Sequence, residues 1–151
     1  MKKILIPVDF SEPSSRAVAY GKKMALAFDG KVTLLHVVHD KMMYNDSGGL
    51  TAASRAPTVT YLGEMLEKDR ADAMEMMEKY KEVFQGTGVE VECIVVEGSP
   101  ADKIVDYVEE NLMDMVIIGS EGIGSALRRV FLGSVANRVL HHVKVPVLLV
   151  Q

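Results

Sequence analysis

Five short apolar runs divide the chain. Their residues are largely β-branched and follow one another with few polar interruptions, which is typical of strands covered on both faces in a parallel sheet. Strands are therefore expected at residues 4–8, 32–38, 89–96, 115–118 and 145–150.

Segments with a helical spacing of apolar residues separate these runs. The first is expected to begin at Ser11, with Pro13 in its first turn, and to close at Gly30. The third begins at Ser99, and the fourth begins near Ser134. The residues with this apolar period are Ala17, Tyr20, Gly21, Met24 and Phe28, then Leu66, Ala73, Met77, Tyr80 and Phe84, then Ile104, Val105, Val108 and Leu112, and finally Val135, Ala136, Val139, Leu140 and Val143.

Strands and helices alternate along the chain, so right-handed crossovers place helices on both faces of the sheet. The expected fold is a single α/β domain over residues 1–151, with a doubly wound five-stranded parallel sheet. One connection is unusually long: residues 39–63 contain Gly48, Gly49 and Pro57 but no clear apolar period. We expect a functional flap or a mobile insertion there.

Composition and charge narrow the classes of function. The net charge is −4 and no run of Lys or Arg stands out, which argues against binding to DNA or RNA. No stretch approaches the ~20 apolar residues of a membrane span. Cys93 is the sole cysteine, so it has no partner for a disulfide within the chain or for a CxxC motif. The expected location is the reducing cytoplasm.

Open parallel sheets bind ligands beyond the carboxyl ends of their strands. Residues 7–9, 36–38 and 119–125 fall at such ends, and the last segment holds three glycines. Glycines let backbone N–H groups approach a ligand, and Gly133-Ser134 then opens a helix whose N-terminus favours an anion. Phosphate is the natural candidate, and ordinary turn glycines are the alternative. The spacing matches neither a Walker loop nor the GxGxxG fingerprint.

A combination of motifs extends over nearly the whole sequence. The motifs are Lys3-Ile4-Leu5-Ile6-Pro7-Val8-Asp9-Phe10-Ser11, Leu34-Leu35-His36-Val37, Glu97-Gly98, Gly119-Ser120-x-Gly122, Leu132-Gly133-Ser134-Val135-Ala136 and Val145-Pro146-Val147-Leu148. In this order and spacing the chain resembles the universal stress protein family.

This resemblance implies an adenine-nucleotide site. The family's nucleotide-binding members place Gly-x2-Gly-x9-Gly-(Ser/Thr) around the phosphates, and the matching residues here are Gly119, Gly122, Gly133 and Ser134. It also implies that Asp9 contacts the ribose or the base. The adenine slot would be formed by Pro7, Val8, Val37 and Ile118, and Val135 is expected at the site beside Ser134.

The ligand expected from the resemblance is ATP, or AMP or ADP. Magnesium is expected to bind through the phosphates, since no carboxylate cluster is evident to hold it. The expected strand order is 3-2-1-4-5, which puts the apolar last strand, residues 144–151, at a sheet edge where unpaired backbone groups invite pairing. The resemblance likewise points to a homodimer through this strand.

Two features depart from the family pattern. Ten residues, 123–132, separate Gly122 from Gly133 where the pattern has nine. Glu121 stands where the family often has Arg or His, which puts a negative charge close to the expected phosphates. Both features are expected to weaken binding of the triphosphate more than binding of the adenosine part.

No catalytic motif is evident, because GxSxG, HExxH and convincingly paired carboxylates are all missing. We therefore expect an ATP-binding stress-response regulator, with slow ATP hydrolysis as a conceivable side reaction. The alternatives are an adenylate-handling hydrolase or transferase, and a scaffold that binds no nucleotide. Taken singly, Asp9 also suits a helix cap and His36 a hydrogen-bonded core histidine.

Overall fold

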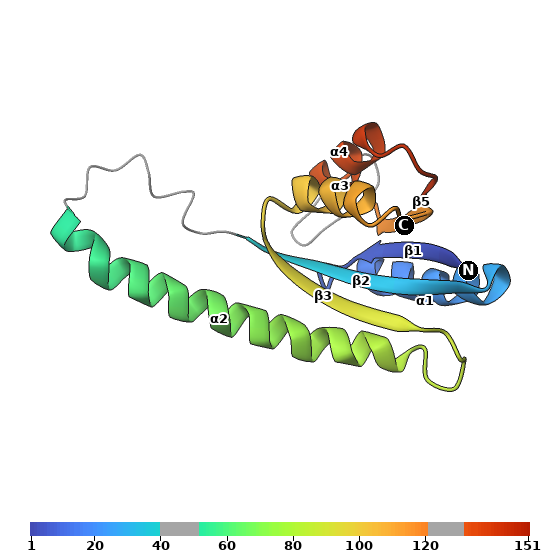
Figure 1. Cartoon of the computed structure of the whole chain (residues 1–151), viewed down its shortest axis with the longest axis horizontal. Helices are drawn as coiled ribbons and strands as arrows, with labels where there is room; N and C mark the ends of the chain where they lie inside the picture. The colour runs from blue at the N-terminus through green and yellow to red at the C-terminus, as the bar shows by residue number, and fades with distance from the viewer. Residues whose placement is uncertain (40–51, 121–131) are drawn as a thin grey trace.

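The computed structural model describes residues 1–39, 52–120 and 132–151, with the backbone alone for 52–60 (Figure 1). Within these ranges it contains β1 (Lys2–Pro7), α1 (Glu12–Phe28), β2 (Gly30–His39), α2 (Ala52–Glu82), β3 (Val91–Gly98), α3 (Pro100–Glu110), β4 (Met115–Gly119), α4 (Ser134–His142) and β5 (Val147–Val150). None of these helices combines the length and the apolar character that crossing a membrane requires.

The five strands form one parallel sheet in the order β3-β2-β1-β4-β5, which confirms the expected fold and strand order. Each strand begins and ends within two residues of the range predicted from the apolar runs. The runs are uninterrupted because the central strand is covered on both faces: Ile4, Leu5 and Ile6 of β1 are all fully buried. Strands β3 and β5 form the two edges.

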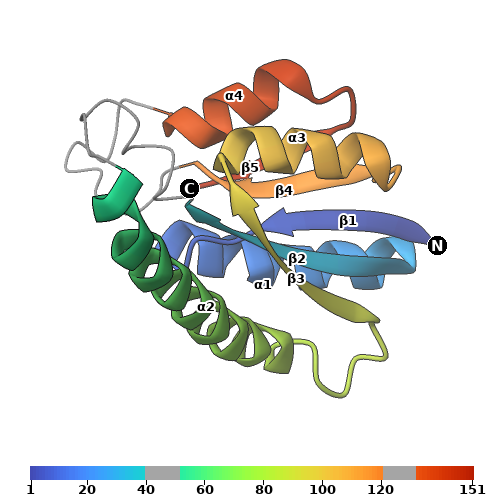
Figure 2. The same cartoon turned by 60° about the vertical axis from the view of Figure 1, so that its left-hand side comes forward.

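Helices cover both faces of the sheet. Helices α1 and α2 lie on one face, and α3 and α4 lie on the other (Figure 2). The side chains of β1 alternate between these layers: Ile4 and Ile6, and Val8 just after the strand, join the cluster that contains α1 residues, whereas Leu5 joins the cluster of α3 and α4. The sheet is thus a buried middle layer, and its carboxyl edge is open to the loops that follow the strands.

Polar residues cap helix α1 at both ends, Ser11 before it and Asp29 after it. The hydroxyl of Ser11 accepts a hydrogen bond from the Ser14 N–H, which makes Ser11 the N-cap, as the sequence predicts. The prediction that Gly30 closes the helix is wrong, because Asp29 takes the left-handed conformation, with φ of 48°. Gly30 is the first residue of β2, where a Cβ would lie 3.1 Å from the carbonyl oxygen of Lys2. Close packing of two strands, rather than a turn, favours glycine at this position.

Helix α2 is longer than the sequence pattern indicates. It begins at Ala52, so residues 52–63 are helical and the expectation of an irregular connection there is wrong. The N-terminal part of α2 projects beyond the sheet in Figure 1. A helix with no core beside it has no packing reason for an apolar stripe, which explains the missing period. The rest of the predicted flap, residues 40–51, lies outside the described residues.

Several side chains expected on buried helix faces are exposed instead. Helix α3 ends at Glu110, and Leu112 follows it in the left-handed conformation with 77% of its surface exposed. Met113, next along the chain, enters the core in its place. Tyr20, Phe28 and Leu140 are also exposed. The apolar spacing predicted the helices correctly and failed for side chains at their margins or ends.

Candidate functional site

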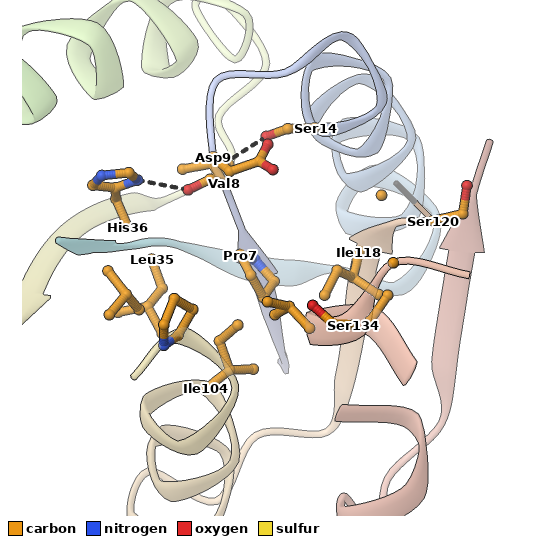
Figure 3. A pocket seen from close by; sticks show the side chains of 16 residues that line it. Pro7, Val8, Asp9, Ser14, Leu35, His36, Ile104, Ile118, Ser120 and Ser134 are labelled. Carbon is orange, nitrogen blue, oxygen red and sulfur yellow. Dashed lines mark hydrogen bonds between the residues drawn. The ribbon is translucent and has the colours of Figure 1, made fainter. Parts of the chain in front are cut away.

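A cavity of about 520 Å³ lies at the carboxyl edge of the sheet. It is lined by segments that are far apart in the sequence: the ends of β1, β2 and β4 and the first turns of α1, α3 and α4 (Figure 3). Nine predicted site residues line it, namely Pro7, Val8, Asp9, Val37, Ile118, Gly119, Gly133, Ser134 and Val135. Gly122 and Glu121 lie outside the described residues.

One part of the cavity is an apolar slot. The side chains of Pro7, Leu35, Ile104 and Ile118 come from β1, β2, α3 and β4 and face the same space (Figure 3). All four are buried in the protein. Apolar walls drawn from a sheet and a neighbouring helix suit a flat aromatic ring, which loses little hydration when it enters such a slot.

Asp9 stands at the side of this slot, in the loop between β1 and α1. Its Oδ1 accepts two hydrogen bonds from Ser11, from the N–H at 3.1 Å and from the hydroxyl at 2.5 Å. Its own N–H donates to the Ser14 hydroxyl at 3.2 Å. Asp9 is therefore not the helix cap, which is Ser11, and within the described residues these bonds leave the Oδ2 oxygen for other partners.

The first turn of α4 forms the opposite side. Gly133 is its N-cap residue, and its N–H donates to the Ser120 carbonyl at 2.7 Å. The N–H groups of residues 134–136 have no acceptor within the helix, and among the described residues no side chain caps them. These groups and the helix dipole make this turn attractive to an anion.

Gly119 lines the cavity and also has a packing role that the sequence did not suggest. A Cβ here would lie 2.9 Å from the Cβ of Pro13, and 3.1 Å from the backbone nitrogen of Ser14. Real Cβ atoms essentially never lie within 3.0 Å of such a neighbour, and the backbone contact is also tight, so the glycine allows the first turn of α1 to pack against the end of β4. Gly119 shapes the cavity by bringing these two segments together.

Seven further residues line the cavity, namely Ser14, Leu35, His36, Pro100, Ile104, Ser120 and Ala136. His36 and Ser120 fall within the predicted strand-end segments 36–38 and 119–125, but none of the seven was assigned to the site. His36 was expected to be a hydrogen-bonded core residue; it is half-buried, and its Nδ1 lies 2.7 Å from the Val8 carbonyl oxygen. Because that oxygen only accepts, Nδ1 bears the proton. The signal that could have found Pro100 is its position directly after the end of β3, at the start of a helix.

Metal ligands do not gather at this cavity among the residues that the structure describes, where no group of three His, Cys, Asp or Glu side chains could hold an ion. As far as the described residues go, a cation here would need ligands from a bound molecule or from water. That requirement matches the chemistry of magnesium, which keeps several waters and favours phosphate oxygens.

A sequence profile described as the universal stress protein family matches residues 1–151. The chain belongs to the universal stress protein family. Universal stress protein MJ0531 of Methanocaldococcus jannaschii is 31% identical over 99% of this chain and 82% of its own length. Universal stress protein MJ0577 of the same organism is 32% identical over 99% of this chain and 94% of its own length.

Solved structures of the family share the fold. The structure of MJ0577 matches with a TM-score of 0.82, at 31% identity over 99% of this chain and 94% of that one. A universal stress protein from Archaeoglobus fulgidus in complex with dAMP matches with a TM-score of 0.68, over 100% of this chain and 98% of that one. At its 21% identity, this second likeness concerns the fold alone.

Proposed function

We propose that this protein binds an adenine nucleotide, ATP above all, in the cavity at the carboxyl edge of the sheet, and acts as a nucleotide-dependent regulator of a stress response. The strongest support is the convergence of residues that were assigned separately to base, ribose and phosphate. Within the described chain they come from β1, β2, β4 and α4 and line a single cavity.

The shape and chemistry of the cavity fit the parts of a nucleotide in order. A volume of about 520 Å³ is within the range of small-molecule sites. The apolar slot of Pro7, Leu35, Ile104 and Ile118 would take adenine, together with Val8 and Val37, which also line the cavity. Asp9 Oδ2 would accept a hydrogen bond from a ribose hydroxyl. The first turn of α4 would receive phosphate. The dAMP complex of the Archaeoglobus fulgidus relative is in keeping with a ligand of this class on this fold.

Magnesium, where present, would be held through the phosphates and water. The chain's own contribution would be to bind and orient the nucleotide, with backbone N–H groups at α4 and the carboxylate of Asp9. The protein is proposed as one nucleotide-binding domain with regulation, not turnover, as its main activity. Such a regulator would report nucleotide level through contacts with other proteins.

A homodimer through β5 is part of the same proposal. Strand β5 lies at the sheet edge and pairs with β4 on one side, as the described residues show. Its free side presents N–H and C=O groups that an identical strand would satisfy across a two-fold axis. Light scattering should give twice the chain mass at micromolar concentration, whereas the chain mass alone would exclude a stable dimer.

The test of binding combines retained ligand, affinity and turnover. Protein purified without added nucleotide is heat-denatured, and the supernatant is analysed by mass spectrometry for ATP, ADP and AMP. Calorimetry then measures the affinity for each, with GTP as the comparison, and phosphate release measures turnover. Retained or tightly bound adenine nucleotide without multiple turnovers supports the regulator. Rapid turnover would indicate the hydrolase or transferase, and no ligand or affinity would indicate the scaffold.

A cavity-filling variant ties binding to this site. Val37→Trp places a large ring in the proposed adenine slot and should abolish nucleotide binding while the protein stays folded. The matched control is Val83→Trp, at an exposed position that does not line the cavity. Equal affinities in Val37→Trp and the control would place the nucleotide elsewhere.

A further inference from the structure

Phe10 has an unusual backbone for its residue type. It follows Asp9 in the loop between β1 and α1, and its φ is 64°. An L-residue with a bulky side chain avoids this left-handed region because its Cβ crowds the following carbonyl oxygen. Glycine would adopt the same backbone without that cost. The presence of phenylalanine therefore indicates that contacts of its ring hold the loop in this shape.

The ring of Phe10 is held between two other aromatic rings. Its centroid lies 4.5 Å from that of His36, at an interplanar angle of 33°, and 5.9 Å from that of Tyr80, at 23°. Both distances are typical of stabilising aromatic pairs. Because His36 belongs to β2 and Tyr80 to α2, the loop is held by a strand and by a helix that are remote in the sequence.

Both neighbouring rings are themselves fixed. The Nδ1–H of His36 donates to the Val8 carbonyl at 2.7 Å, so the same side chain holds the end of β1 and the ring of Phe10. The hydroxyl of Tyr80 lies 2.8 Å from the hydroxyl of Ser15 in the first turn of α1. The loop between β1 and α1 is thus held on both sides of Asp9.

The left-handed turn at Phe10 determines where the Asp9 carboxylate points. The Ser11 N–H and hydroxyl both reach Asp9 Oδ1, which requires the chain to fold back at the residue between them. A flexible residue 10 would let this turn open, and Asp9 would then sample several orientations at the cavity. The aromatic contacts remove that freedom before a ligand arrives.

We propose that Phe10 is a positioning residue of the ligand site, which, clamped between His36 and Tyr80, fixes the turn that aims the Asp9 carboxylate into the cavity. The inference that this carboxylate meets a ribose rests on the proposed function, whereas the positioning of Asp9 does not. Tyr80 makes α2 part of the site's support, although none of the described residues of α2 lines the main cavity.

The variant Phe10→Gly separates the ring from the backbone shape. Glycine accepts the left-handed conformation, so the fold should survive while the clamp is lost. Affinity for adenosine should fall about tenfold, as expected when a hydrogen bond to a charged group is weakened. Affinity for 2′,3′-dideoxyadenosine, which lacks both ribose hydroxyls, should stay within about twofold of wild type. Asp9→Asn should show the same selective loss of adenosine affinity. Phe10→Tyr, which keeps an aromatic ring at this position, should bind adenosine as the wild type does.

Leu112→Gly is the matched control. Leu112 has a φ of 50° and is exposed, and it does not line the cavity. This substitution makes the same backbone change away from the site and should leave both affinities unchanged. Two further variants test the two aromatic contacts of Phe10 one at a time. His36→Asn keeps an N–H donor for the Val8 carbonyl but removes the imidazole ring, and Tyr80→Leu removes the phenol ring. Each should give part of the selective loss seen in Phe10→Gly.

Amide hydrogen exchange provides a readout that needs no ligand. The Ser11 N–H, bonded to Asp9, should exchange about tenfold faster in Phe10→Gly than in wild type, and should not change in Leu112→Gly. If wild-type protein binds neither nucleoside, the proposed function fails and this exchange decides the positioning role alone. The proposal would be overturned if the Ser11 amide of Phe10→Gly exchanged at the wild-type rate. It would also be overturned if folded Phe10→Gly lost affinity for adenosine and for 2′,3′-dideoxyadenosine to the same extent.

Discussion

Helices α1 and α4 both begin at the carboxyl edge of the sheet, but their first turns are completed differently. In α1 the Ser11 hydroxyl caps the Ser14 N–H, Glu12 adds a negative charge, and β4 packs against the turn at Gly119. In α4 the N-cap is Gly133, and the described residues supply neither a side-chain cap nor an acidic residue in the first turn.

The difference indicates two separate tasks. The partial positive charge at the start of α1 is compensated within the protein, so this turn serves as a rigid mount for Asp9. The equivalent charge at α4 remains uncompensated among the described residues and faces the cavity. Changes at the start of α1 should therefore alter stability, and changes at the start of α4 should alter binding of anionic ligands.

The largest effect is expected where β4 meets α1. Gly119→Ala forces a Cβ against the backbone of residues 13 and 14 and should lower the free energy of unfolding by about 1–3 kcal/mol in urea denaturation. Gly63→Ala is the control, since in the described part of the chain nothing lies within 4 Å of a Cβ at that position in α2. It should raise the free energy of unfolding by about 0.5–1 kcal/mol. Wild-type stability in Gly119→Ala would show that the contact is not tight.

Removing the cap of α1 should have the next largest effect. Ser11→Ala loses the hydroxyl that accepts from the Ser14 N–H and donates to Asp9, keeps the backbone N–H bond to Asp9, and should lower the free energy of unfolding by about 1 kcal/mol. Ser134→Ala, the same change at the first residue of α4, should leave stability within about 0.5 kcal/mol of wild type. Comparable losses in both variants would abolish the distinction between the two turns.

Binding should show the reverse pattern. Ser134→Ala removes a hydroxyl at the proposed phosphate end, so calorimetry should show ATP affinity reduced about two- to fivefold, with adenosine affinity unchanged. An equal reduction for ATP and adenosine would mean that Ser134 contacts the nucleoside, or that the variant disturbs the whole cavity.

A weaker effect is expected at the amino edge of the sheet, far from the cavity. The Lys3 N–H donates to Asp114 at 2.8 Å and, as the main cause, lowers the pKa of that carboxyl below its ordinary value of 3.8. The folded protein favours the charged carboxylate of Asp114. Its contribution to the free energy of unfolding is therefore complete above the ordinary pKa and is lost as the pH falls through the lowered pKa. In acid unfolding followed by circular dichroism, Asp114→Asn should show a shallower loss of stability than wild type. An unchanged acid profile would remove Asp114 from this account.

Much of the fold was predictable because its strands are buried on both faces. Such strands leave continuous apolar runs, and in β1 through β5 these runs mark the ends to within two residues. The first part of α2 was not predictable from apolar periodicity. A helix shows that periodicity where one of its faces packs against the protein, and this part of α2 projects past the sheet. Leu112 was assigned to the apolar face of the third helix because the helical spacing reached it, but α3 ends two residues earlier.

The site was predictable to a smaller degree. Strand-end position and the family resemblance selected nine residues that the structure brings to one cavity, although their contacts with a ligand remain predictions. Ile104 and Ala136 were missed as cavity residues, because a helix face that meets a cavity has the same apolar spacing as one that meets a core. The left-handed backbone of Phe10 was also missed, since phenylalanine rarely adopts a positive φ and its presence does not predict one.

The central claim is that an adenine nucleotide lies with its phosphates at the start of α4 and its sugar at Asp9. Amide resonances followed by NMR during titration with ATP and with adenosine test it most directly. ATP is expected to shift the signals of residues 134–136 and of Asp9, whereas adenosine is expected to shift Asp9 and to leave residues 134–136 nearly unmoved. If millimolar ATP leaves all of these signals in place, the proposed site is wrong.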